Sequence, residues 1–200
     1  MNLVERAKHI ILTPQSEWQV IAPEATTVAG LYRGYILPLA AIGPVAQWLG
    51  FSVIGVSLPF AVGTYRVPLL AGLANAVLTY VLGLAGIYLL SLIVDALAPT
   101  FGAEKNARQA LKVVAYSYTP AWVAAVLHLV PSLGILVLLA ALYNLYVLYL
   151  GLPVLMKAPR EKSLGYVAVT VVCAVLLLVV IGMIAGALSG AGSPYSSIHV

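Results

Sequence analysis

Charged residues are scarce in this sequence. Lysine, arginine, aspartate and glutamate make up only 8% of the 200 residues, whereas soluble domains carry about 25%. The hydrophobic fraction is 62% and the mean hydropathy is +1.05. This composition excludes an ordinary water-soluble domain and indicates a membrane protein.

The sequence also lacks the residues and motifs of several kinds of site. A single cysteine, Cys173, excludes an intrachain disulfide. His9, His128 and His199 are far apart in the sequence, so we expect no metal site. No H-E-x-x-H, G-x-S-x-G or Gly-rich phosphate loop occurs, and the basic residues form no stripe for nucleic acid. We therefore expect neither an enzyme nor a cofactor, and no nucleic-acid partner.

Long apolar runs are what the sequence has in abundance. A transmembrane helix needs about 20 mainly apolar residues. Five runs reach that length, at about 29–51, 67–97, 110–129, 132–156 and 164–190. They predict an all-α polytopic membrane protein, with a five-helix transmembrane domain at 27–190 and a short external tail at 191–200.

The positive charges favour one orientation of these spans. One side holds Arg66 alone. The other side, which includes the N-terminus, holds eight basic residues: Arg6, Lys8, Lys105, Arg108, Lys112, Lys157, Arg160 and Lys162. Because cytoplasmic loops carry an excess of lysine and arginine, the N-terminus is predicted to be cytoplasmic and the C-terminus external.

Residues 1–26 precede the first span and predict two short helices. The apolar residues of NLVERAKHII share one face, with Glu5, Arg6 and Lys8 off it. Thr13 is the predicted N-cap and Pro14 the first residue of the second helix, PQSEWQVI. We expect this pair to lie on the cytoplasmic leaflet as interfacial helices. Packing of the pair against the protein itself is the alternative.

Polar side chains in the spans gather in the cytoplasmic half. Three prolines, Pro38, Pro120 and Pro153, lie at a similar level and are expected to bend their helices. Bends at one depth predict a polar cavity that faces the cytoplasm. Its candidate lining residues are Arg33, Tyr35, Asp95, Tyr116, Tyr118, Tyr146 and Tyr149.

Simpler explanations exist for several of these residues. Tyrosines near membrane interfaces, such as Tyr32, Tyr35 and Tyr166, also form aromatic belts. We expect Arg33 to pair with Asp95 or to share the tyrosine cluster, and snorkelling of Arg33 to the headgroups is the alternative. Asn144 lies deeper, where an amide should bind a partner helix.

Small residues repeat along two of the spans. The stripe in the second span is Gly72, Ala76, Thr79, Gly83 and Gly86, and the stripe in the fifth is Gly182, Gly186 and Gly190. The candidate packing residues are Gly72, Ala76, Gly83 and the three glycines of the fifth span. Such stripes let helix backbones approach closely. We expect them to pack within one chain, and a homodimer is the alternative.

Four stretches together resemble the Yip family, the Ypt/Rab-interacting membrane proteins, in its bacterial branch. They are LTPQSEWQVIAPE, LYRGYILPLAAIGP, QALKVVAYSYTPAW and LYNLYVLYLGLPVLMKAPREKSLGY. The resemblance implies five spans, a cytoplasmic N-terminus and a place in the bacterial inner membrane. Eukaryotic members bind small GTPases in vesicle traffic, an activity that we do not expect here. The resemblance carries over no site residue.

Two classes of function remain from the sequence. The first is a non-enzymatic scaffold or adaptor that uses the N-terminal helices and the basic cytoplasmic loops to engage lipids or a membrane-protein partner. The second is a transporter or channel that binds a small solute, an ion or a lipid in the cytoplasmic cavity. We favour the scaffold, because the outer halves of the spans are nearly all apolar.

Overall fold

The computed structural model describes residues 2–57, 64–130 and 133–190, and the predicted tail at 191–200 lies outside them. Within these ranges the chain is helical apart from β1 (Val56–Ser57) and β2 (Thr64–Tyr65), which pair antiparallel. Five helical stretches are long and apolar enough to cross a membrane: Val28–Ile54, Leu69–Phe101, Ala107–Leu129, Ile135–Leu155 and Arg160–Leu188. The predicted all-α fold with five spans is therefore confirmed.

Two of the spans are interrupted helices. The first consists of α3 (Val28–Leu31), a π-helical turn (Tyr32–Ile36), α4 (Leu37–Ala40), α5 (Ile42–Leu49) and a second π-helical turn (Gly50–Ile54). The third consists of α7 (Ala107–Ser117), α8 (Thr119–Ala124) and a 3-10 helix (Ala125–Leu129). Pro38 and Pro120 each lie in the first turn after an interruption, where a missing N–H is tolerated. Pro153, in contrast, lies inside the continuous helix α9 (Gly134–Leu155).

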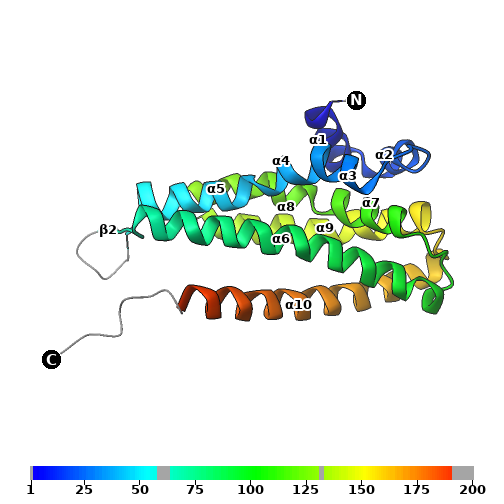
Figure 1. The fold of residues 1–200 in the computed structure, drawn as a ribbon. Helices are drawn as coiled ribbons and strands as arrows, with labels where there is room; N and C mark the ends of the chain where they lie inside the picture. The colour runs from blue at the N-terminus through cyan, green and yellow to red at the C-terminus, as the bar shows by residue number, and fades with distance from the viewer. Residues whose placement is uncertain (1, 58–63, 131–132, 191–200) are drawn as a thin grey trace.

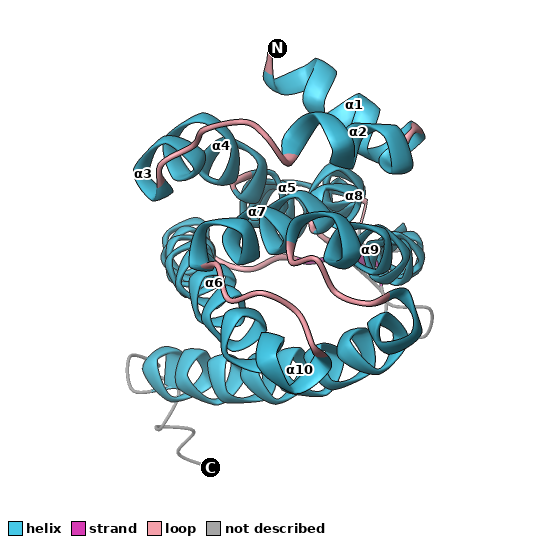
Figure 2. Ribbon diagram, turned by 90° about the vertical axis from the view of Figure 1, so that its right-hand side faces the viewer, coloured by secondary structure: helices cyan, strands magenta, loops and turns pink. Residues whose placement is uncertain are grey.

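The remaining long helices are α6 (Leu69–Leu97), which a 3-10 turn (Ala98–Phe101) extends, and α10 (Arg160–Gly190). Figure 1 shows the spans running side by side along one bundle, with α10 at its edge. Seen from one end in Figure 2, α7 lies in the middle of the bundle and α10 borders one side. Accordingly the third span is the most buried of the five and the fifth the least.

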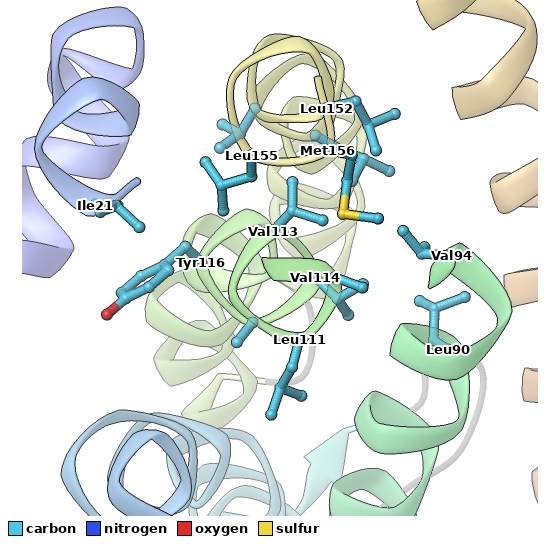
Figure 3. Close-up of a cluster of buried hydrophobic side chains, with 14 of the residues drawn as sticks. Ile21, Leu90, Val94, Leu111, Val113, Val114, Tyr116, Leu152, Leu155 and Met156 are labelled. Atoms are coloured by element: carbon cyan, nitrogen blue, oxygen red, sulfur yellow. The ribbon is translucent and has the colours of Figure 1, made fainter. Parts of the chain in front are cut away.

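The core is built around α7. Every residue of α7 from 110 to 117 is buried, as expected for a helix with neighbours on all sides. In Figure 3, Leu111, Val113 and Val114 of α7 lie among residues of α2, α6 and α9, including Val94 and Met156. Within a bilayer such contacts stabilise through close packing, because lipid tails are as apolar as the side chains.

The N-terminal helices α1 (Leu3–Leu12) and α2 (Pro14–Ile21) pack on the bundle. Ile10, Trp18 and Ile21 are fully buried, and the Trp18 indole Nε1 donates to the carbonyl of Val147 in α9 at 3.1 Å. Of the two placements considered above, packing against the protein is the one observed. Thr13 precedes α2 as predicted, but its hydroxyl does not cap that helix and donates to the carbonyl of His9 instead.

The two stripes of small residues do not pack against each other. Added Cβ atoms at Gly83, Gly182 and Gly186 would meet nothing within 4 Å. The prediction that these glycines pack closely against another helix of the same chain is therefore wrong. Helix α6 uses Gly72 against Ser52 and Trp48, with Ala76 buried nearby. Its contact with α10 is at Gly86, the last residue of its stripe, where a Cβ would lie 2.9 Å from Ile181 Cδ1. The surroundings of Gly190 lie outside what the structure describes.

Candidate functional site

The seven residues of the predicted polar cavity do not line one pocket. Tyr35 and Tyr116 meet with ring centroids 4.4 Å apart, and the Tyr35 hydroxyl hydrogen-bonds Thr119 Oγ1 at 2.7 Å. Tyr118 lines a different, apolar cavity, and Tyr149 lines a pocket beside α2. Tyr146 is exposed. The prediction of one shared pocket is therefore wrong, because Tyr35 and Tyr116 contact each other whereas Tyr118, Tyr146 and Tyr149 lie in other surroundings.

The predicted pairing of Arg33 with Asp95 is also wrong. No ion pair joins them in the described part of the chain, and Arg33 is exposed. Because Arg33 lies near the start of the first span, its long side chain can reach the headgroups, as in the snorkelling alternative. Asp95 lies near the end of α6, and its buried Oδ1 has no hydrogen-bond partner among the described residues.

Asp95→Asn is therefore expected to lower the free energy of unfolding by no more than about 0.5 kcal/mol, and a slight rise is equally consistent with the structure. The reason is that no ion pair is lost and less charge is desolvated. Chemical unfolding of the purified variant in bicelles measures this. A loss of more than about 2 kcal/mol, the size expected for a broken charge network, would show that Asp95 has a structural partner.

Several tyrosine hydroxyls tie one helix to the backbone of another. Tyr32 donates to the Leu84 carbonyl at 2.8 Å, and Tyr80 to the Leu37 carbonyl at 2.9 Å. Tyr166, fully buried and stacked on Phe101, donates to the carbonyl of Val94. A hydroxyl in hydrocarbon needs an acceptor, and each helical carbonyl has a second lone pair to offer. For Tyr166 the aromatic belt is therefore the wrong explanation.

Asn144 binds a partner helix, as predicted. Its Oδ1 accepts from the backbone N–H of Ala121 at 3.2 Å. Ala121 lies in the first turn of α8, where helical N–H groups have no partner in their own helix. The interruption before Pro120 thus creates an orphan donor, and α9 supplies its acceptor.

The most concentrated polar site is one that the sequence analysis missed. The Arg6 guanidinium donates to Glu17 Oε1 at 2.5 Å and also to Glu24 Oε1. Both Arg6 and Glu17 are buried, and the guanidinium lies 5.8 Å from the ring centroid of Tyr116. His9 Nδ1 lies 3.5 Å from the other oxygen of Glu17. We call Arg6, Glu17, Glu24 and Lys112 the charge cluster.

Lys112 connects the charge cluster to α7. Its buried ammonium donates to the carbonyls of Ile21 at 3.0 Å and Glu24 at 2.5 Å, while Gln109 Nε2 donates to the Ala22 carbonyl at 3.0 Å. These carbonyls lie at and just beyond the C-terminal end of α2, where a helix lacks internal donors and favours a cation. Lys112, a buried residue of α7, therefore belongs to the charge cluster.

A signal for this cluster was present in the sequence. Arg6 is three residues from Leu3 and four from Ile10, so all three share one face of α1. Glu17 has the same relation to Pro14 and Ile21 in α2. Placing Arg6 off the apolar face was therefore wrong. Opposite charges on the apolar faces of consecutive helices predict a buried pair, because burying either charge alone would carry a large free-energy cost.

The charge cluster is balanced in sign, with Arg6 and Glu17 buried and with Glu24 and Lys112 beside an open pocket. Arg6 pairs with both acidic side chains and lies over the Tyr116 ring, while Lys112 donates to the backbone carbonyls of Ile21 and Glu24. Among the described residues no group of histidine, cysteine, aspartate and glutamate could hold a metal ion. Its geometry suits holding α1 and α2 against the bundle.

Fold and site together define a multi-pass helical membrane protein with a short N-terminal helix pair locked on its bundle. The sequence matches the family model of the Yip1 domain over residues 8–183, so the chain belongs to that family. It is similar to the proteins named inner membrane protein YohC of Escherichia coli strain K12 and of Escherichia coli O6:H1. Each is 29% identical over 172 residues, which cover 84% of this chain and 87% of the relative. No solved structure matches.

Proposed function

We propose that this chain is a non-enzymatic scaffold of the bacterial inner membrane, with its N-terminus in the cytoplasm and its C-terminus outside. Family membership and the names of the relatives support the location in the inner membrane. The basic residues support the orientation, because all except Arg33 and Arg66 lie in or beside α1, the α6–α7 connection and the α9–α10 connection.

The observation that carries the proposal is the locked helix pair. The charge cluster fixes α1 and α2 against the side of the bundle, where α1 contacts α7 and α8 and α2 contacts α9 (Figure 1). On their outer faces Val4, Leu12 and Val20 are exposed, by 49–73%. A rigid apolar surface among basic residues suits a membrane-protein partner whose cytoplasmic segment is apolar and acidic.

The transporter alternative loses its main support. It relied on one cavity lined by the seven polar residues, and the structure distributes these residues over separate sites. The scaffold needs only the cytoplasmic surface.

Photocrosslinking in cells tests the scaffold. A photoreactive amino acid at Val4 or Leu12 is expected to give discrete protein adducts, whereas Leu176, exposed on α10, is expected to give lipid adducts only. Arg6→Met, which releases the helix pair, is expected to reduce the protein adducts about tenfold, the effect of about 1.4 kcal/mol. Each partner identified is then re-tested as purified protein. Lipid adducts alone at Val4 and Leu12, or adducts that survive Arg6→Met, would contradict the proposal.

A further inference from the structure

A cavity of about 330 Å³ lies between α6, α7, α8, α9 and α10. Leu90, Leu148 and Ala174 are among the apolar residues that form most of its wall. The volume falls within the range of about 300–1,000 Å³ that is typical of small-molecule sites. No charged side chain lines the cavity. Because burying an unpaired charge is costly, any ligand of this site is neutral.

Two buried hydroxyls in the wall have no partner. Ser117 of α7 is 2% exposed and Thr170 of α10 is 1% exposed. Neither oxygen has a hydrogen-bond partner among the described residues. An unpaired buried hydroxyl is unfavourable. The hydroxyls of Tyr32 and Tyr80 donate to carbonyls of neighbouring helices, whereas Ser52 in the first span is also buried without a partner. Two unpaired hydroxyls from different helices in one cavity therefore indicate a missing acceptor.

The cavity opens sideways to the bilayer. Leu138 of α9 and both Val175 and Leu178 of α10 line it, and each is more than half exposed. Since these residues belong to membrane-spanning segments, the exposed side faces lipid rather than water. Helix α10 is also the least buried span and borders the bundle in Figure 2. A ligand dissolved in the membrane can enter between α9 and α10.

We propose that this cavity binds a neutral, membrane-dissolved hydrocarbon molecule through a carbonyl oxygen that accepts hydrogen bonds from Ser117 and Thr170. A carbonyl offers two lone pairs and so satisfies both hydroxyls, whereas a plain alkyl chain satisfies neither. Two sources supply this chemistry, the acyl ester of a lipid and a membrane quinone. The inference is independent of the proposed scaffold role, because it concerns a site inside the bundle.

Photolabelling in nanodiscs tests the binding. The full-length protein is irradiated with a palmitoyl ester that carries a diazirine, and labelled peptides from α9 and α10 are quantified. Methyl palmitate, decylubiquinone and hexadecane serve as unlabelled competitors. We expect one carbonyl compound to compete at least about tenfold better than hexadecane, a difference of about 1.4 kcal/mol, and the better competitor identifies the source. Equal competition by hexadecane would overturn the proposal.

Matched variants locate the site. Ala174→Phe fills the cavity, and Ala168→Phe makes the same change at an exposed position of α10. We expect labelling of these peptides to be lost in the first variant and kept in the second. Labelling that persists in Ala174→Phe would overturn the assignment.

Thr170→Val tests the hydroxyl without filling the space. It is expected to remove the preference for carbonyl compounds over hexadecane, while the melting temperature of the ligand-free protein stays the same or rises, because no hydrogen bond is lost. A lower melting temperature with an unchanged carbonyl preference would show that Thr170 has a structural role only.

Discussion

Replacing Arg6 with methionine is expected to weaken the docking of α1 and α2 on the bundle by about 3–5 kcal/mol, the usual cost of removing one partner of a buried ion pair. Glu17 would stay buried with only His9, 3.5 Å away, near its carboxylate. Glu24 would lose the same cation, although its side chain is partly exposed. Loss of the guanidinium also removes the contact with the Tyr116 ring.

Cysteine accessibility measures this effect. In a Cys173→Ala background, Ala7→Cys places a small thiol on the buried face of α1 and Val4→Cys places one on the exposed face. Maleimide labelling at position 7 is expected to be slow with Arg6 and fast with Arg6→Met, while labelling at position 4 is fast in both.

The control for Arg6→Met separates charge from packing. Lys8→Met removes a positive charge from an exposed position of the same helix and is expected to have no effect. Arg6→Met combined with Glu17→Leu is expected to recover most of the docking, because apolar residues of similar size often replace a buried pair without loss. Labelling at position 7 that stays as slow in Arg6→Met as with Arg6 would show that the ion pair does not hold the helices.

The spans could be predicted from the sequence because hydropathy depends on local composition alone. The partner of Asn144 was predictable in kind for a similar reason, since any amide at that depth needs one. Its target, the N–H of Ala121, could not be predicted, because it exists only where α8 begins again after an interruption. That interruption depends on how the third span packs.

The errors concern which side of a helix faces which neighbour. Depth along a span placed the tyrosines together, but rotation about the helix axis separates Tyr116 from Tyr118 and directs them to different surroundings. The carbonyls that accept from Tyr32 and Tyr166 have no sequence signature, because every residue carries one. Gly182 and Gly186 resemble a packing stripe, yet α10 contacts α6 on another face.

A second large effect is expected where α2 crosses α9. Gly151 of α9 lies against Trp18, and a Cβ added there would be 2.7 Å from Trp18 Cε2, Trp18 Cζ2 and Val113 Cγ2. Gly151→Leu therefore cannot be accommodated unless α2 moves, and overpacking of this kind costs about 1–3 kcal/mol. A displaced Trp18 also loses its hydrogen bond to the Val147 carbonyl. Labelling of Ala7→Cys is expected to become fast, as with Arg6→Met.

Gly83→Leu is the matched control, because Gly83 also lies within a long apolar helix but has nothing within 4 Å of an added Cβ. It is expected to leave labelling unchanged and to stabilise α6 slightly, since glycine within a helix costs about 0.5–1 kcal/mol relative to alanine. Arg6→Met and Gly151→Leu act on the same helix pair, so once one has released α1 and α2 the other has little left to disrupt. Their combined effect should fall below the sum of the two. If the two effects were fully additive, the charge cluster and the Trp18 contact would hold separate parts of the chain.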